Sequence, residues 1–163
     1  MKYSTFVSAI CVTILTIGFH LTAQAADAIE IKNVAEREVE IVKDGKKVMV
    51  RVNVDRAVPG DEIIYTTTFK NLINKPVANI FITNPVPNDS LYKGNSASGA
   101  NTDIVFSIDG GKQYAAPDKL MVKTSEGKMR PALPSDYTHI RWTYKGELGV
   151  GKTGIVSFRA VIK

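Results

Sequence analysis

The stretch Gly146–Lys163, GELGVGKTGIVSFRAVIK, decides between two very different folds. Its first eight residues fit the phosphate-loop pattern G-x-x-x-x-G-K-[ST], with Lys152 and Thr153 in the last two positions. The pattern binds a nucleotide only where a strand enters the loop and a helix leaves it, because the helix N-terminus helps the backbone N–H groups to hold the phosphates. The structure of the residues after Thr153 therefore determines whether the motif has its usual chemistry.

These residues alternate with a period of two. One face carries Val156, Phe158, Ala160 and Ile162, and the other carries Ser157, Arg159 and Lys163. A glycine followed by two β-branched residues is a poor start for a helix and suits a strand. We therefore predict that GELGVGKT is a Gly-rich hairpin loop between two antiparallel strands, and that the chain binds no nucleotide.

The same alternation runs through much of the chain. Asp44-Gly45 separates the alternating segments 38–41 and 48–54, which predicts a hairpin because a tight turn needs positive φ. Val48, Val50, Val52 and Val54 form the dry face of the second segment, opposite Arg51, Asn53 and Asp55. Further strands are predicted at 62–69, 77–83, 103–108, 120–123, 139–144 and 155–163, with a second hairpin turning at Asp109-Gly110-Gly111 toward 112–115.

No segment shows the i, i+3, i+4, i+7 spacing of an amphipathic helix. Short strands separated by turns at intervals of about 8 to 12 residues are typical of an antiparallel sandwich. We predict an all-β fold, an antiparallel immunoglobulin-like β-sandwich of about eight to nine strands, with residues 38–163 as a single domain.

The first 25 residues have the organisation of a secretory signal peptide. Lys2 precedes the apolar run 6–21, and Ala23-Gln24-Ala25 matches the small-x-small pattern of signal peptidase. The apolar run is shorter than the roughly 20 residues of a membrane-spanning helix, so we predict cleavage after Ala25 and no stable membrane insertion afterwards. An uncleaved anchor is the alternative. The protein is then exported to the periplasm, cell surface or medium of a bacterium, with residues 26–37 as a leading segment.

Cleavage would remove much of the reactive chemistry that the chain possesses. The one cysteine, Cys11, and one of the two histidines, His20, lie in the signal segment. Without them the chain has no thiolate for catalysis or metal binding, and the core must hold the fold without disulfides. His139 remains as the single imidazole.

Several short motifs follow one another in a fixed order between about residues 55 and 163. They are Pro59-Gly60-Asp61 with Tyr65 and Asn71; Val77, Ile80 and Ile82 with Asn84-Pro85-Val86-Pro87; Ser96 to Gly99; Ser107 to Gly111; and Gly151 to Phe158. In this order they resemble the DUF11 conserved-repeat domain of bacterial cell-envelope proteins. The resemblance implies a secreted or surface structural module with no shared catalytic residue. Asn84 stands where that family usually has Asp, and only one copy is present where many relatives carry tandem arrays.

The polar residues that could form a site each have an ordinary structural explanation. His139 lies on the polar face of a predicted strand and has no second histidine for a zinc site. Asp61, Glu62, Asp103 and Asp109 could bind calcium through oxygen ligands, but the dense spacing of a calcium loop is absent and Asp is common in turns. No catalytic, cofactor-binding or metal-binding residue is therefore predicted.

Two further groups could contact a ligand. Trp142 could stack on a sugar ring, although it shares a face with Ile140 and Tyr144 and is expected in the core. A cluster of cations could meet an anionic polymer or an acidic partner, and comprises Lys112, Lys119, Lys123, Lys128 and Arg130. A solvated charged rim is the expected interpretation of this cluster, and nucleic acid binding is not predicted because interleaved aromatic residues are lacking.

The function that these observations favour is an exported, non-catalytic envelope module that acts through protein contact. Sandwich edges can accept or donate strands, and the alternating segment Ile29-Glu30-Ile31 could pair with the edge of a neighbouring chain. The same segment could instead be a flexible leader or pair within its own domain. A module that binds glycan or another surface polymer, through strand faces or the loop 93–101, is one alternative. A hydrolase with an unrecognised carboxylate pair is another.

Overall fold

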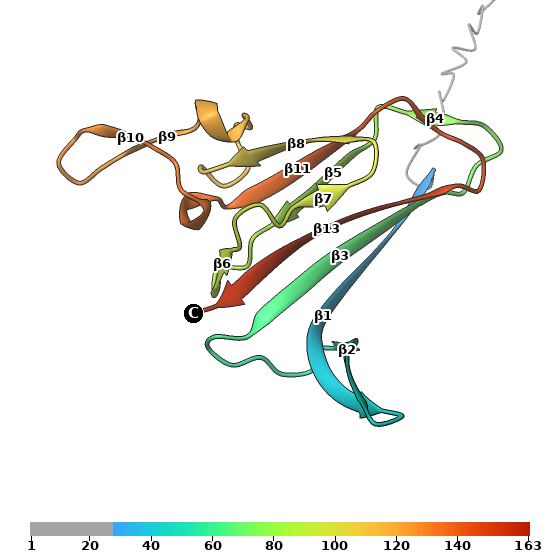
Figure 1. Cartoon of the computed structure of the whole chain (residues 1–163). Coiled ribbons are helices and arrows are strands. Elements are labelled where there is room, and N and C mark those ends of the chain that lie inside the picture. Colours follow the sequence, from blue (N-terminus) through green and yellow to red (C-terminus); the bar gives the residue numbers. More distant parts are fainter. Residues whose placement is uncertain (1–27) are drawn as a thin grey trace, which may run out of the picture.

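The computed structural model describes residues 28–163 (Figure 1). The predicted signal peptide and the first two residues of the leading segment lie outside the described residues. Within 28–163 the regular elements are strands and two single-turn 3-10 helices, η1 (Pro117–Lys119) and η2 (Pro134–Asp136). Over this range no helix is long and apolar enough to span a membrane. The all-β class and its antiparallel pairing are therefore confirmed.

The described residues contain thirteen strands. They are β1 (Ile29–Lys43), β2 (Lys46–Asn53), β3 (Glu62–Asn71), β4 (Val77–Ala78), β5 (Phe81–Pro85), β6 (Ser90–Tyr92), β7 (Ser98–Gly99), β8 (Thr102–Ser107), β9 (Met121–Lys123), β10 (Met129–Pro131), β11 (His139–Tyr144), β12 (Glu147–Leu148) and β13 (Thr153–Ile162). They exceed the predicted eight or nine because two- and three-residue strands such as β7, β10 and β12 lie in segments expected to be loops.

Two sheets account for most of the pairing. The larger has the order β2-β1-β3-β13-β6, with β7 also on β13, and the smaller has the order β5-β11-β8. Two further two-stranded sheets, β10-β9 and β12-β4, lie in the connections. Every pair is antiparallel, although neighbours in the sheets are often distant in the chain.

The core takes its side chains from both larger sheets. Val156, Phe158 and Ala160 of β13 are at most 1% exposed, as are Ile140 and Trp142 of β11. The rings of Trp142 and Phe158 meet across the core with centroids 6.3 Å apart. The predicted inner faces of these two strands and the predicted core position of Trp142 are therefore confirmed.

The three predicted hairpins have different outcomes. Asp44-Gly45 does turn β1 into β2, with φ values of 52° and 73°. The turn at Asp109–Gly111 leads back to β8 through one bridge, between Phe106 and Ala115, and no second strand forms. The hairpin predicted at GELGVGKT is wrong, because β11 and β13 belong to different sheets and the intervening β12 pairs with β4.

Asn71, at the end of β3, joins this crossing segment to the main sheet. Its side chain is fully buried, and its Nδ2 group donates to the carbonyls of Lys75, Leu148 and Gly149 at 2.8 to 3.2 Å. Its Oδ1 accepts the N–H of Ile73 at 3.0 Å. One amide thereby supplies partners for backbone groups of two loops, which would otherwise be left unsatisfied.

We expect Asn71→Ala to lower the free energy of unfolding by about 2–4 kcal/mol, because several buried backbone groups lose their partner together. Chemical denaturation of the purified protein measures the change. Asn74→Ala is the matched control, since Asn74 is exposed in the same loop and should change stability by no more than about 0.5 kcal/mol. An equal effect of the two substitutions would contradict this role for Asn71.

Gly154 near the start of β13 lies directly under an aromatic ring. It pairs with Phe69 across the ladder, and a Cβ atom added to Gly154 would overlap the Phe69 ring. Gly154→Ala should therefore destabilise the fold by about 1–3 kcal/mol. Combining it with Phe69→Leu should cost less than the sum of the two single changes, as measured in a double-mutant cycle. Additive losses would show that the two positions do not share this contact.

Candidate interaction surface

β1 has different partners along its two halves. Residues Ile29 to Glu36 pair with β3, whereas Glu36 to Lys43 pair with β2 on the opposite side of the strand. The described part of the leading segment is thus a strand of its own sheet. The sequence left open whether this segment pairs with a neighbouring chain, is a flexible leader or pairs within its own domain. In the structure it pairs within its own chain, with β3.

The first half of β1 has one satisfied backbone edge and one open edge. Successive residues of an antiparallel strand direct their N–H and C=O groups to alternate sides. Leu72 N–H donates to the carbonyl of Ala28, so even-numbered residues face β3. Val54 N–H donates to the carbonyl of Ala35, so odd-numbered residues face the opposite side.

The pairing register of β2 ends at Glu36, so no strand within residues 28–163 pairs with that side of β1 beyond Ala35. We call this unpaired strip, beside the described residues 28–34, the open lane. The odd-numbered residues Ile29, Ile31 and Asn33 present their backbone groups to it. No strand of the described chain pairs with these groups, and they are available to an added strand.

A series of side-chain hydrogen bonds connects the first half of β1 to β3 and β5. Asn84 Nδ2, on β5, donates to Thr67 Oγ1 at 2.8 Å, and Thr67 Oγ1 donates to Asn33 Oδ1 at 2.6 Å. These hydrogen bonds link three strands and both larger sheets. They need a donor at position 84, which a carboxylate would not provide.

A cavity of about 320 Å³ lies next to these hydrogen-bonded side chains, between the first half of β1 and the end of β5. Its lining is largely apolar and includes Ala35, Tyr65 and Phe158 on one side and Pro85 and Pro87 on the other. The smaller sheet ends at β5, so the inner face of β1 is covered only in part. Ile31 on that face is 54% exposed.

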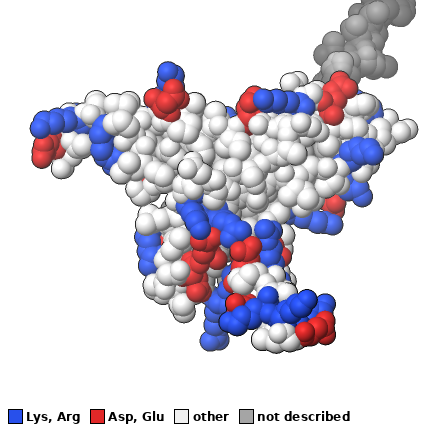
Figure 2. All heavy atoms as spheres, viewed as in Figure 1, with Lys and Arg blue, Asp and Glu red and all other residues white. Residues whose placement is uncertain are grey.

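Residues 37–53, which we call the arm, project from the body as a two-stranded ribbon (Figure 1). The sequence predicts a dry face for the valines of β2, but Val48 and Val52 are each 36% exposed and the core includes no residue of the arm. Strand periodicity shows that one face of a strand is apolar, but it does not show whether another part of the protein covers that face. Figure 2 shows charged side chains concentrated around the arm, whereas the body is largely uncharged in this view.

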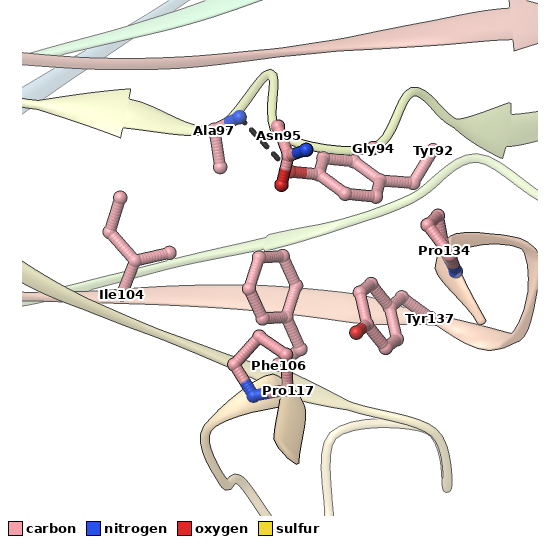
Figure 3. Close-up of a pocket in the computed structure, with 9 residues that line it drawn as sticks. All are labelled: Tyr92, Gly94, Asn95, Ala97, Ile104, Phe106, Pro117, Pro134 and Tyr137. Atoms are coloured by element: carbon pink, nitrogen blue, oxygen red, sulfur yellow. Dashed lines mark hydrogen bonds between the residues drawn. The ribbon is translucent and has the colours of Figure 1, made fainter. Parts of the chain in front are cut away.

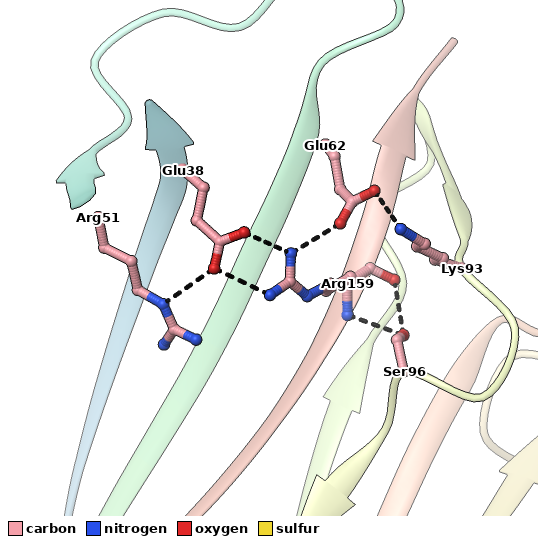
Figure 4. A network of polar contacts seen from close by, with 6 residues as sticks. All are labelled: Glu38, Arg51, Glu62, Lys93, Ser96 and Arg159. Atoms are coloured by element: carbon pink, nitrogen blue, oxygen red, sulfur yellow. Dashed lines mark hydrogen bonds and ion pairs between the residues drawn. The ribbon is translucent and has the colours of Figure 1, made fainter. Parts of the chain in front are cut away.

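Arg159 of β13 links the arm to the sheet on the outer face (Figure 4). Its guanidinium contacts Glu38 through two hydrogen bonds of 3.0 and 3.1 Å and Glu62 through one of 2.8 Å. Lys93 binds the other side of Glu62 at 2.6 Å, and Arg51 lies 3.6 Å from Glu38. Sequence patterns give no sign of this network, because Glu38 and Arg159 are separated by 121 positions.

The network perturbs both carboxyl groups in the same direction. The hydrogen bond from Arg159 holds the pKa of Glu38 below its ordinary value. Hydrogen bonds from Lys93 and then Arg159 do the same for the pKa of Glu62. A general acid of a glycosidase needs a raised pKa, so this pair of carboxylates is suited to holding strands together and not to acid catalysis.

A second cavity, also about 320 Å³, lies beside the loop 93–101 (Figure 3). Tyr92, Phe106 and Tyr137 line it, and the Phe106 and Tyr137 rings stack with centroids 4.5 Å apart. The Tyr92 hydroxyl accepts the N–H of Ala97, which fastens the loop. These three residues are only 5 to 8% exposed, so their rings do not form the open platform on which a sugar would stack.

The four acidic residues considered for calcium do not come together. Glu62 belongs to the Arg159 network, and Asp61 accepts from the N–H of Val58 at 3.0 Å. Asp103 pairs with Lys145, and Asp109 accepts from Gln113 N–H and Ser107 Oγ, which lowers its pKa. Within residues 28–163 no group of three or more potential metal ligands forms.

Most of the other residues singled out from the sequence also have local partners. His139 Nδ1 lies 3.2 Å from Thr138 Oγ1, at the start of β11. Three members of the cation cluster are paired with nearby acids: Lys119 with Asp118, Lys128 with Glu126, and Arg130 with Asp136 through two hydrogen bonds. Lys112 and Lys123 lie in the same region, next to the Asp109 turn and in β9 respectively.

The phosphate-loop motif also lacks its structural setting. β13 begins at Thr153, where a nucleotide-binding loop would start a helix. The carbonyls of Leu148 and Gly149 point at Asn71, and the Lys152 N–H donates to the carbonyl of Gly149. The loop therefore uses its backbone groups to hold itself against β3.

No protein-family model matches the chain, and no curated protein matches it.

The Arg159 network makes stability depend on pH in the acidic range. Glu38 and Glu62 have a lower pKa in the folded chain than in the unfolded chain, where it is near 4.5. Their contribution is therefore present above about pH 4.5 and is lost as the pH falls through the folded pKa. We expect Arg159→Met to lower the melting temperature at pH 7 and to have much less effect at pH 3.

The control for this experiment is Arg56→Met, which removes an exposed cation that forms no ion pair with another described residue. Its melting temperature should follow that of the unmodified protein at both pH values. A deficit in Arg159→Met that is as large at pH 3 as at pH 7 would mean that Arg159 stabilises the fold through its packing alone.

Proposed function

We propose that the chain is an exported, non-catalytic module of the bacterial cell envelope, acting in the periplasm or at the cell surface through protein contact. The organisation of residues 1–25 as a signal peptide supports export. The protein contact is proposed to run along a sheet edge. The open lane beside the first half of β1 is the observation that carries this proposal.

We further propose that the two larger sheets form an immunoglobulin-like sandwich of the DUF11 kind. The shared core between β11 and β13 supports this arrangement. The motif residues also have structural roles: Asn71 binds two loops, Gly154 accommodates Phe69, and Ser107 and Asp109 hold the turn that follows β8. Residues that serve turns and packing fit a structural module.

The open lane supports protein contact because its groups need a strand. Backbone N–H and C=O groups that alternate along an exposed edge match the spacing of another β-strand. The adjoining inner face, with the exposed Ile31, could bury apolar side chains of the added strand. The glycan-binding and hydrolase alternatives have less support, since the rings of Tyr92, Phe106 and Tyr137 are enclosed and Glu38 and Glu62 are paired with cations.

Ile31→Pro tests this function. Proline removes the N–H of Ile31, which faces the open lane, and leaves the bonds of the even-numbered residues to β3 in place. We expect the variant to keep a melting temperature within a few degrees of the original and to lose protein association. Association is measured by light scattering after size exclusion, and by crosslinking of the protein with envelope proteins.

Lys32→Pro is the matched control, one position along. It removes an N–H that faces β3, so it should lower the melting temperature more than Ile31→Pro does. The edge function fails if the unmodified protein neither self-associates nor retains an envelope protein whose binding depends on Ile31.

A further inference from the structure

We propose that the strand that fits the open lane is the same strand of a second copy, so that two chains pair edge to edge about a two-fold axis at Ile31. The proposal rests on the edge function proposed above and identifies the partner. Its support comes from the direction of the backbone groups, the positions of two charges and the place where the lane ends at β2.

The backbone allows only some registers. Two antiparallel copies of β1 can form a ladder when the outward-facing, odd-numbered residues of one copy lie opposite odd-numbered residues of the other. A two-fold axis that passes through a residue satisfies this condition. With the axis at Ile31, that residue lies opposite its own copy, Ile29 lies opposite Asn33, and every outward N–H and C=O has a partner.

The charges select one of these registers. With the axis at Ile31, Glu30 of each copy lies opposite Lys32 of the other, which forms two cross-strand ion pairs. Shifting the axis by one residue places Glu30 opposite Glu30 or Lys32 opposite Lys32. Within one chain the two side chains are 3.3 Å apart on the outer face, and both are exposed, so they are free to exchange partners.

The end of the lane at β2 is compatible with the same axis. β2 ends its pairing at Glu36, and Val54 occupies the place beside Ala35. The outward-facing residues Ile29, Ile31 and Asn33 all lie beyond Ala35, so their pairs about this axis do not meet Val54. On the inner face the two copies of Ile31, each 54% exposed in one chain, would lie against each other.

Charge reversal tests the register. Glu30→Lys places lysine opposite lysine, and Lys32→Glu places glutamate opposite glutamate, so each variant alone should self-associate at least about tenfold more weakly. An equimolar mixture of the two variants restores both opposite-charge pairs and should form a heterodimer. The double variant Glu30→Lys/Lys32→Glu should form a homodimer. Sedimentation velocity or light scattering, with the signal peptide removed, gives the dissociation constants.

Glu126→Lys is the control for net charge, because Glu126 is exposed in the turn between β9 and β10, far from the start of β1 (Figure 1). It should dimerise like the unmodified protein. Ile31→Cys adds a second readout in a processed chain without cysteine: opposite residues in this register are close enough for a disulfide between copies. Ile155→Cys, on the outer face of β13, should form far less of this intermolecular disulfide.

The outcomes separate this proposal from the function on which it rests. Dimers that are lost in the single variants and restored in the mixture support it. A protein that stays monomeric at high concentration, or dimers that ignore both reversals, overturn it. If the chain is monomeric but binds an envelope protein that Ile31→Pro releases, the edge function survives with a different partner. If neither association depends on Ile31, both proposals fail.

Discussion

The position of β3 between β1 and β13 is the constraint on which the rest of the structure depends. Every residue of this strand is paired on one or both sides, so its register fixes both neighbours at once. Its Thr67 hydroxyl joins β1 to the smaller sheet, and Asn71 at its end holds the crossing segment that leads into β13. A shift of β3 by one residue would turn all of these side chains to the opposite face.

The features that could be predicted from the sequence are those with a local cause. Asp44-Gly45 predicts its hairpin because both residues tolerate positive φ, and they adopt it. The alternation in β11 and β13 identifies the buried faces because period two is a property of a single strand. The partner of each strand is a different matter: alternation looks the same whether the neighbour is adjacent or distant in the chain, which is why the sequence predicts a hairpin at GELGVGKT and the structure has none.

The candidate interaction surface was harder to predict from the sequence, again because it depends on partners that are distant in the sequence. Asn71 has the sequence appearance of a turn residue, and its role depends on carbonyls up to 78 positions away. The alternating valines of β2 predict an apolar face but carry no information on what covers it. The alternation of Ile29–Ile31 predicts a strand, and the segment forms one. Whether it pairs with its own chain depends on β3, which lies more than 30 residues further on.

The edges of the two larger sheets differ in how they respond to a second copy of the chain. β2 carries Lys46, Lys47 and Arg51 and no acid, so two copies of this edge would repel each other. β5 ends in Pro85, which has no N–H to donate, and the edge of β8 is bridged by Ala115. The first half of β1 carries Glu30 and Lys32, one charge of each sign, two residues apart. Like charges protect an edge from its own copy, whereas this spacing places opposite charges together in one register, which is the arrangement that the proposed dimer requires.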